Sequence, residues 1–382
     1  MQRRSFLKFF TFLLTSLSFK VSSNNNNEKI SFNHGVASGD PTNTNVIIWT
    51  RVTKVSNKSI NVNWEISDDI NFLKIIHSGT TKTSAHKDFT VKVDAKIPKK
   101  YNGTQIFYRF ICNNNFSPVG STITLPIYNP HLFNIAFCSC SNYPAGFFNA
   151  YKEIAKNKEV DLVLHLGDYI YEYDKNGYAS ENSNELDRVS IPSNELISLE
   201  DYRLRHAQYK TDKDLRLLHK NKPMIVVWDD HEFTNNTWKN GAENHSKDEG
   251  IFLNRKINAL KAYYEWMPIR ENTNKTNIWR SFEVGNLFQL LMLDTRLISR
   301  EKQPDINSFF ADGVFDYQSY EKDLQKPRKL LGDKQFRWVK NTLDKKYKWS
   351  IFGQQILIGP QYLPEALKKI DKSLIPEYMH IY

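Results

Sequence analysis

Apolar and polar residues alternate along residues 28–127 of the chain. Turn-forming residues (Gly79, Asn102-Gly103 and Gly120) separate or follow the alternating segments. A period of two places successive side chains on opposite faces of a strand. The apolar positions are Ile60, Val62, Trp64 and Ile66, then Phe89, Val91 and Val93, then Ile106, Tyr108 and Phe110. The pattern predicts an all-β sandwich of the immunoglobulin or fibronectin type over residues 28–127, with Pro126 and Pro130 at its boundary.

The pattern changes near residue 131, where continuous apolar runs replace the alternation. These runs predict buried strands, and amphipathic segments between them predict helices. The strands are expected at residues 133–138, 161–166, 223–228, 287–293 and 349–356, and the helices at 147–157, 199–220, 248–265 and 333–346. Buried strands alternating with helices are typical of an α/β sheet covered on both faces. We therefore predict an α/β sandwich core over residues 131–382.

The first 27 residues differ from both patterns. They contain four basic residues, no acid, and an apolar run of residues 9–19 that is too short to span a bilayer. The segment Arg3-Arg4-Ser5-Phe6-Leu7-Lys8 fits a twin-arginine signal, which export machinery reads as an address. We therefore expect a signal peptide and linker over residues 1–27, and a periplasmic, extracellular or cell-wall location. A short basic anchor is the alternative.

Composition narrows the class of protein further. The 382 residues are 40% hydrophobic and 25% charged, which indicates a globular protein with no stable membrane span. Three cysteines exclude a disulfide scaffold. The net charge of +10 falls by four, to +6, without the first 27 residues. Because the remaining lysines form no dense block with aromatic residues, we expect no nucleic-acid partner.

Polar clusters follow four of the predicted strands. Open α/β sheets bind ligands beyond the carboxyl ends of their strands, so we expect these clusters to meet at one sheet edge. They are Cys140-Ser141-Asn142-Tyr143, Gly167-Asp168-Tyr169-Ile170-Tyr171-Glu172, Asp229-Asp230-His231-Glu232 and Asp294-Thr295-Arg296.

The residue types in these clusters suit a metal site. Asp168 and Asp230 offer carboxylates, Cys140 a thiolate, Tyr171 a phenolate and His231 an imidazole. A thiolate and a phenolate favour a trivalent, redox-capable cation such as iron(III), whereas carboxylates also suit calcium, magnesium or manganese. Two cations sharing an oxygen donor would generate hydroxide at neutral pH and neutralise a phosphoryl group.

Each cluster also has a purely structural interpretation. Gly167-Asp168 can be a simple turn, and Asp229–Glu232 can cap a helix and complement its dipole. Cys140 can be a small buried residue, and Tyr171 can be a packing residue. Four such clusters after four strands favour an active site over these separate explanations.

Several segments together resemble the PhoD-type alkaline phosphatases, a branch of the metallophosphoesterases. The most specific are GDYIYE (167–172) and WDDHE (228–232) followed by Asn235-Asn236. The similarity extends to FNHGVASGDPTNTNVIIWTRV (32–52), SCSNYPAGFFNAYKEIA (139–155), LMLDTR (291–296) and LGDKQFRWVKNTL (331–343). The resemblance implies a metallophosphoesterase core preceded by a β-sandwich.

The resemblance also implies roles for individual residues. Cys140, Asp168 and Tyr171 would bind iron(III), with Asp168 bridging to a calcium ion. Asp230 would ligate the second metal, and His231 would contact the phosphate or the leaving group.

Three further polar side chains have less specific implied roles. Asn235, with Asn236 beside it, would support the calcium side. Arg296 and Arg203 are candidates for phosphate contacts, with structural salt bridges as the alternative.

We therefore predict an exported, metal-dependent phosphoric ester hydrolase that uses a metal-bound hydroxide on phosphomonoesters or phosphodiesters. Two alternatives remain. The resemblance implies a Gly-Asp-x-His segment that would lie beyond residue 382, and Asp371 and His380 are not part of such a motif. In the first alternative, the chain is therefore a fragment that binds metal weakly and does not turn over substrate. The chain could also be a binding protein that acts through its β-sandwich.

Overall fold

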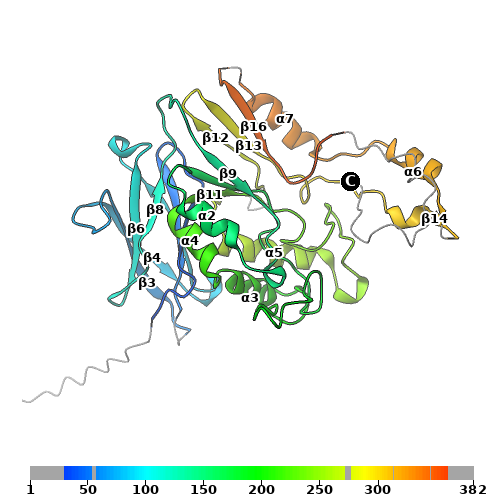
Figure 1. The fold of residues 1–382 in the computed structure, drawn as a ribbon, viewed down its shortest axis with the longest axis horizontal. Helices are drawn as coiled ribbons and strands as arrows, with labels where there is room; N and C mark the ends of the chain where they lie inside the picture. Colours follow the sequence, from blue (N-terminus) through cyan, green and yellow to red (C-terminus); the bar gives the residue numbers. More distant parts are fainter. Residues whose placement is uncertain (1–29, 54–56, 272–276, 313, 345, 360–382) are drawn as a thin grey trace, which may run out of the picture.

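The computed structural model describes residues 30–53, 57–271, 277–312, 314–344 and 346–359 (Figure 1). The predicted signal peptide of residues 1–27, and Asp371 and His380, lie outside the described residues. None of the helices in the described ranges is long and apolar enough to cross a membrane.

A six-stranded sheet forms the centre of the molecule, in the order β5-β2-β1-β11-β10-β9. Strands β1, β11, β10 and β9 run parallel, and β2 and β5 continue the sheet in antiparallel fashion. The strands are β1 (Val36–Gly39), β2 (Asn45–Arg51), β5 (Thr90–Lys96), β9 (Ile135–Cys138), β10 (Leu162–His165) and β11 (Pro223–Val226).

This sheet joins the N-terminal region to the core, a continuity that the sequence pattern did not reveal. Ser38 and Gly39 of β1 pair with Pro223 and Met224 of β11. A Cβ atom on Gly39 would lie 2.3 Å from the Pro268 carbonyl oxygen, so only glycine permits this approach.

A second sheet completes the predicted β-sandwich. Its strands follow the order β4-β3-β6-β7, and β8 also pairs with β6. They are β3 (Ile60–Ser67), β4 (Ile75–Thr83), β6 (Gln105–Cys112), β7 (Asn115–Phe116) and β8 (Gly120–Ile123). Alternate residues of β3 and β6, including Val62, Ile66 and Tyr108, pack with Val46 and Ile48 of β2 in one core. The alternation therefore predicted this sandwich correctly.

A three-stranded sheet lies apart from the six-stranded one. It has the order β12-β13-β16, with β12 (Arg280–Val284) antiparallel and β16 (Trp349–Gly353) parallel to β13 (Phe288–Met292). The expectation that all four polar clusters follow strands of one sheet is therefore wrong for Asp294-Thr295-Arg296. Because β13 forms a hairpin with β12, it joins the second layer of the core instead. Helix α7 (Gly332–Thr342) packs on this layer through Val339.

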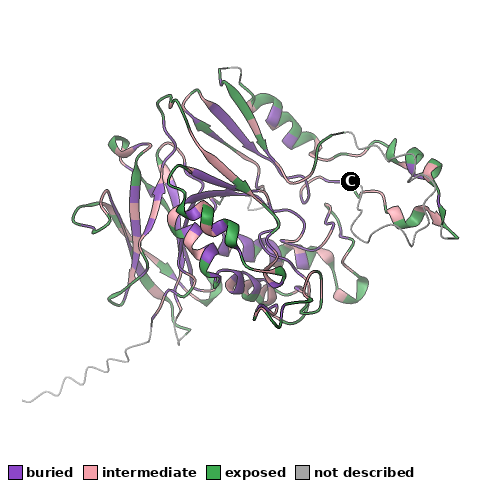
Figure 2. Cartoon of the chain, viewed as in Figure 1, coloured by how far each residue is buried: buried purple, intermediate pink, exposed green. Residues whose placement is uncertain are grey.

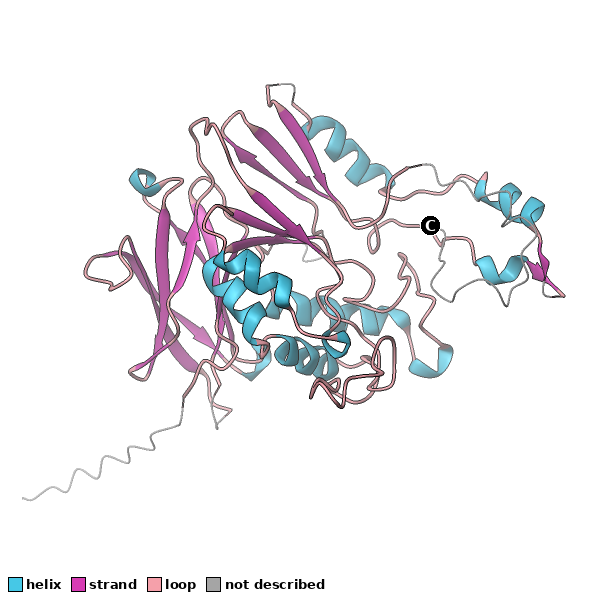
Figure 3. Ribbon diagram, in the orientation of Figure 1, coloured by secondary structure: helices cyan, strands magenta, loops and turns pink. Residues whose placement is uncertain are grey.

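Four helices pack beside the six-stranded sheet (Figure 3): α2 (Asn149–Lys156), α3 (Leu199–Tyr209), α4 (Lys213–Asn221) and α5 (Phe252–Trp266). The single helix expected over residues 199–220 is wrong, because the structure has two. The Asp212 side chain accepts hydrogen bonds from the backbone N–H groups of Asp214 and Leu215, which begins α4 after a break.

A small lobe projects from the core beyond β13 (Figures 1 and 2). It contains η5 (Ile306–Phe309), the short strands β14 (Phe310–Ala311) and β15 (Val314–Phe315), and α6 (Tyr317–Leu324). Most of its residues are exposed or half-buried, with Phe315 and Tyr320 buried inside it.

Candidate metal centre

A cavity of about 220 Å³ opens where four strands end. Both sheets of the core therefore contribute to it, although they do not share an edge. Its walls follow β10 (Asp168), β11 (Asp229, Asp230 and His231), β13 (Arg296) and β16 (Gln355, Ile356 and Leu357).

The loop after β10 is shaped by unusual backbone conformations. Gly167 has φ +110°, and a Cβ atom there would lie 2.5 Å from the Asp229 backbone nitrogen. Asp168 and Cys140 adopt left-handed φ values of 54° and 58°. Such values are uncommon for residues other than glycine and are concentrated at functional sites. The glycine lets the loops after β10 and β11 touch, which brings their carboxylates together.

Cys140 and Tyr171 meet at the same oxygen of Asp168. The Cys140 Sγ lies 3.5 Å from Asp168 Oδ2, and the Tyr171 hydroxyl donates to that oxygen over 3.4 Å. Cys140 is exposed as a residue, but desolvation of its sulfur and the Asp168 carboxylate raise its thiol pKa to about 12. Burial likewise raises the pKa of Tyr171 far above its usual value. Thiolate and phenolate forms at this position would therefore require a cation.

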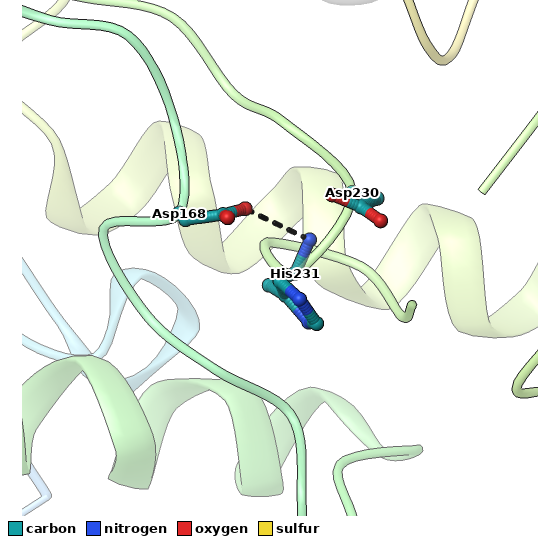
Figure 4. Close-up of side chains that lie close together, drawn as sticks. All are labelled: Asp168, Asp230 and His231. Atoms are coloured by element: carbon teal, nitrogen blue, oxygen red, sulfur yellow. Dashed lines mark hydrogen bonds between the residues drawn. The ribbon is translucent and has the colours of Figure 1, made fainter. Parts of the chain in front are cut away.

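Asp168, Asp230 and His231 form a compact group of metal-ligating side chains (Figure 4). One ligand atom from each lies within 4.8 Å of the others. The Asp168 Oδ1 accepts a hydrogen bond from the His231 backbone N–H over 3.4 Å, and Asp230 Oδ2 accepts one from the Asn236 N–H over 2.6 Å. Burial and the neighbouring Asp229, Asp230 and Glu232 raise the pKa of Asp168 well above its usual value, although His231 opposes this.

His231 is held by a buried carboxylate that sequence reasoning did not single out. Its Nδ1 lies 2.7 Å from Glu172 Oε2, and its ring stacks on Tyr171 at a centroid distance of 4.2 Å. Burial opposes a charge on this ring, yet Glu172, Asp168 and Asp230 together raise the pKa of His231 well above its usual value. The position of Glu172 four residues after Asp168, within GDYIYE, was the only signal of this role.

Arg296 supplies positive charge from the second sheet. Its Nε donates to Asp229 Oδ1, and its Nη2 lies 3.4 Å from Asp230 Oδ1. Although burial opposes the charge of Asp230, Arg296 and His231 hold the pKa of that carboxyl below its usual value.

Glu232 fastens the two acidic loops together. Its Oε2 accepts hydrogen bonds from the backbone N–H groups of Asp168 (3.0 Å) and Asp229 (2.7 Å), and its Oε1 accepts one from Tyr169 (2.5 Å). In the cluster Asp229-Asp230-His231-Glu232, the sequence assigned site roles to Asp230 and His231 and none to Glu232. In the structure this last residue positions the loops.

The amino-acid sequence of the chain matches the models of a described family. The family model for PhoD-like phosphatases matches residues 135–374, and the model for the N-terminal domain of PhoD-like phosphatases matches residues 18–126. The chain belongs to the PhoD-like phosphatase family. It is 36% identical over 358 residues to alkaline phosphatase D of Bacillus subtilis, which covers 90% of this chain and 58% of that protein. A solved structure of PhoD superposes with a TM-score of 0.74 at 36% identity, covering 85% of this chain and 62% of the other. The chain thus spans about three fifths of the length of these relatives.

A second polar network adjoins the candidate metal centre of this PhoD-like chain, at the loop Gly167–Asp168. The Gly167 N–H donates to His165 Nδ1 over 3.3 Å, so the opposite nitrogen carries the proton. That Nε2 lies 2.9 Å from the Tyr151 hydroxyl, which donates to Ser141 Oγ over 2.7 Å. The network connects the loop of Cys140 to the loop of Asp168 through buried side chains. Burial lowers the pKa of His165 to about 3, so the network is neutral.

Lys210 extends this network on the far side of Tyr169. Its Nζ donates to the Tyr169 hydroxyl over 2.9 Å and lies 3.2 Å from His219 Nε2. Complete burial lowers the pKa of Lys210 to about 7. We call Tyr151, His165, Tyr169, Lys210 and His219 the polar floor.

The structure brings most of the predicted site residues together. Cys140, Asp168, Tyr171, Asp230, His231 and Arg296 surround one region, and their individual roles stay predictions. Arg203 does not belong to it, because its guanidinium forms two hydrogen bonds with Glu265 at 2.7 and 2.8 Å. The Asn235 backbone N–H donates to Glu172 Oε1 over 2.6 Å, and its role on the calcium side stays a prediction.

Proposed function

We propose that the chain is a metal-dependent phosphoric ester hydrolase that acts on phosphomonoesters or phosphodiesters. The observation that carries this proposal is the convergence of Cys140 and Tyr171 on one oxygen of Asp168, with Asp230 and His231 beside it. Family membership supports the reaction class.

The donor set fits the iron(III) and calcium ions proposed for it. Cys140, Asp168 and Tyr171 combine a thiol, a carboxylate and a phenol, the combination that suits a trivalent cation. Asp230, the shared Asp168 and the Asn235 side chain would supply oxygen donors to calcium or another divalent ion. Burial and the neighbouring acids raise the pKa of Asp168 well above its usual value, and a bound cation would favour its carboxylate form. When bound, the cations would supply Lewis acidity that activates water and neutralises phosphoryl charge.

The protein's own side chains would orient and protonate the substrate. Arg296 faces the cavity beside Asp229 and Asp230, where it can bind a phosphate oxygen. Nδ1 of His231 is hydrogen-bonded to Glu172, so Nε2 would be the ring nitrogen that protonates the leaving oxygen. Glu172 and the aspartates raise the pKa of His231, which favours the protonated ring that a general acid needs.

The test is hydrolysis of p-nitrophenyl phosphate and bis-p-nitrophenyl phosphate by the purified chain, after loading with iron and calcium. We expect turnover that Tyr171→Phe depresses and that a chelator abolishes. Absence of turnover in a folded, metal-loaded chain would contradict the proposal.

We also propose that the twin-arginine route exports the chain to the periplasm, cell surface or medium. The basis is the segment Arg3-Arg4-Ser5-Phe6-Leu7-Lys8. Replacing Arg3 and Arg4 by lysine should retain the chain in the cytoplasm on cell fractionation. Unchanged export of this variant would contradict the route.

A further inference from the structure

A cavity of about 580 Å³ lies between the β-sandwich and helix α5, away from the metal centre. Its size falls within the range of roughly 300–1,000 Å³ that is usual for sites of small organic ligands. Strands β4 and β5 and the intervening turn form one wall, and α5 forms the other. Its lining residues are Thr81, Lys82, His86, Lys87, Thr90, Val91, Lys92, Ile257, Leu260, Lys261, Tyr264, Glu265 and Glu271.

Hydrogen bonds between the two walls fix the shape of this cavity. The Lys92 Nζ on β5 donates to the Tyr264 carbonyl on α5 over 2.5 Å. Arg203 pairs with Glu265 at 2.7 Å and also donates to the His86 carbonyl over 3.0 Å. The walls are therefore held in place without a ligand, which lowers the cost of binding.

The lining of the cavity includes apolar side chains of α5. Leu260 and Tyr264 lie one turn apart on the same face of α5 and are 9% and 5% exposed. Ile257 continues this face with 52% of its surface exposed. Covering apolar surface with a hydrocarbon chain lowers the free energy of the complex.

The rim of the cavity carries uncompensated positive charge. Within the described ranges, Lys82, Lys87 and Lys261 form no ion pair. The two acids of the lining are already neutralised, because Glu265 pairs with Arg203 and Glu271 pairs with Lys92 at 2.9 Å. The local field therefore favours an anion.

We propose that this cavity binds a single-chain amphiphilic anion. Its carboxylate or phosphate head would lie at Lys82, Lys87 and Lys261, and its hydrocarbon tail would cover Ile257, Leu260 and Tyr264. The site is separate from the proposed hydrolase centre and does not depend on that function.

The test measures binding of decanoate to the full chain by calorimetry, without added metal and below the critical micelle concentration. A carboxylate probe avoids the phosphate preference of the metal centre. We expect decanoate to bind, and acetate, octyl glucoside and decyltrimethylammonium to bind much more weakly. Equal binding of decanoate and decyltrimethylammonium would overturn the proposal.

Two sets of variants locate the site. The triple change Lys82→Gln, Lys87→Gln and Lys261→Gln should weaken decanoate binding by roughly tenfold or more. The control changes the exposed lysines Lys220, Lys247 and Lys334 to glutamine, which removes the same charge elsewhere, and should leave binding unchanged.

A second pair of variants, one inside and one outside the cavity, tests the apolar part of its lining. Ile257→Ser should weaken binding by roughly fivefold, whereas Leu253→Ser, one turn earlier on α5 and 57% exposed, should not. Decanoate binding that Arg296→Ala abolishes and the triple variant does not would place the anion at the metal centre and overturn the proposal. Binding to anionic phosphatidylglycerol vesicles with none to monomeric decanoate would also overturn it, in favour of a membrane surface.

Discussion

Two buried polar regions lie on either side of the loop Gly167–Asp168 and differ in charge. Above it, Asp168, Glu172, Asp229, Asp230 and Glu232 form an acid cluster, compensated by Arg296 and His231. Below it, the polar floor contains histidines, tyrosines and one lysine that contact one another as neutral or nearly neutral groups.

The difference separates chemistry from positioning. Burying carboxylates together is unfavourable unless cationic groups accompany them, so the acid cluster would favour a bound cation. Hydrogen bonds join Tyr151 to His165 and Lys210 to Tyr169 in the floor without any carboxylate, so the floor positions the loops without attracting cations. The contrast predicts that substitutions in the acid cluster alter activity first and that substitutions in the polar floor alter stability first.

Asp168→Asn should have the largest effect of the changes considered. Loss of the carboxylate that Cys140 and Tyr171 share should lower kcat by on the order of 10³-fold or more. Because the pKa of Asp168 is raised on folding, the folded chain disfavours its charge at neutral pH, and the metal-free variant should be at least as stable as the wild type. Steady-state kinetics and urea unfolding measure the two quantities.

The matched control is Asp174→Asn, which changes an exposed carboxylate six residues later in the chain. It should retain wild-type kinetics. A large drop in metal-free stability for Asp168→Asn would mean that this residue is structural, which would erase the distinction between the two regions.

Lys210 should make stability depend on pH. Its pKa is lowered from 10.5 to about 7 in the folded chain, so between these values the unfolded chain binds a proton that the folded chain lacks. The free energy of unfolding should therefore rise with pH between pH 7 and 9, by about 1.4 kcal/mol per unit from this group. Urea unfolding at pH 7, 8 and 9 measures the slope. Lys210→Met should reduce it, whereas the exposed Lys213→Met should not, and equal slopes in all three proteins would refute a deprotonated Lys210.

Tyr151→Phe removes one hydroxyl from the floor. The hydroxyl lies between His165 and Ser141, so its loss should lower the free energy of unfolding by about 1–2 kcal/mol. Activity of the metal-loaded chain should fall only a few-fold, because no donor to the cations is lost. Tyr128→Phe, at an exposed tyrosine, is the control. A kcat loss as large as that of Asp168→Asn would show that the floor takes part in the chemistry.

Arg203→Ala should have the smallest effect on activity. The sequence left Arg203 as either a phosphate contact or a structural salt bridge, and its guanidinium pairs with Glu265. We expect an unchanged kcat and a stability loss of about 1 kcal/mol for this partly buried pair. Arg296→Ala, measured beside it, should lower kcat/KM strongly. Equal losses for the two variants would contradict the placement of only one arginine at the site.

Part of the acid cluster could be predicted from the sequence, whereas its member Glu172 and the polar floor could not. Asp168, Asp230 and His231 follow predicted strands directly, so strand position alone places them at the same end of the core. His165 lies inside a strand, and Tyr151 and Lys210 lie in or beside helices, where they are indistinguishable from packing residues in a sequence. Only the folded geometry shows that they contact one another.

The fold divides in a similar way. Local alternation identified β3 and β6, and apolar runs identified β9, β10 and β11. Long-range pairing decides which strands share a sheet. Neither the pairing of β1 with β11 nor the placement of β13 in another sheet therefore had a local signal in the sequence. The break between α3 and α4 did have one, because Asp212 is a favoured helix-capping residue.

The central claim is that the acid cluster around Asp168 holds the catalytic cations. Its most direct test is the metal content and visible spectrum of the purified chain after exposure to iron and calcium and removal of unbound ions, compared with Asp168→Asn and Tyr171→Phe. We predict stoichiometric iron in the wild type, with a phenolate-to-iron absorption band that Tyr171→Phe abolishes, and no retained iron in Asp168→Asn. Equal iron content in the wild type and Asp168→Asn, or a spectrum unaffected by Tyr171→Phe, would contradict the claim.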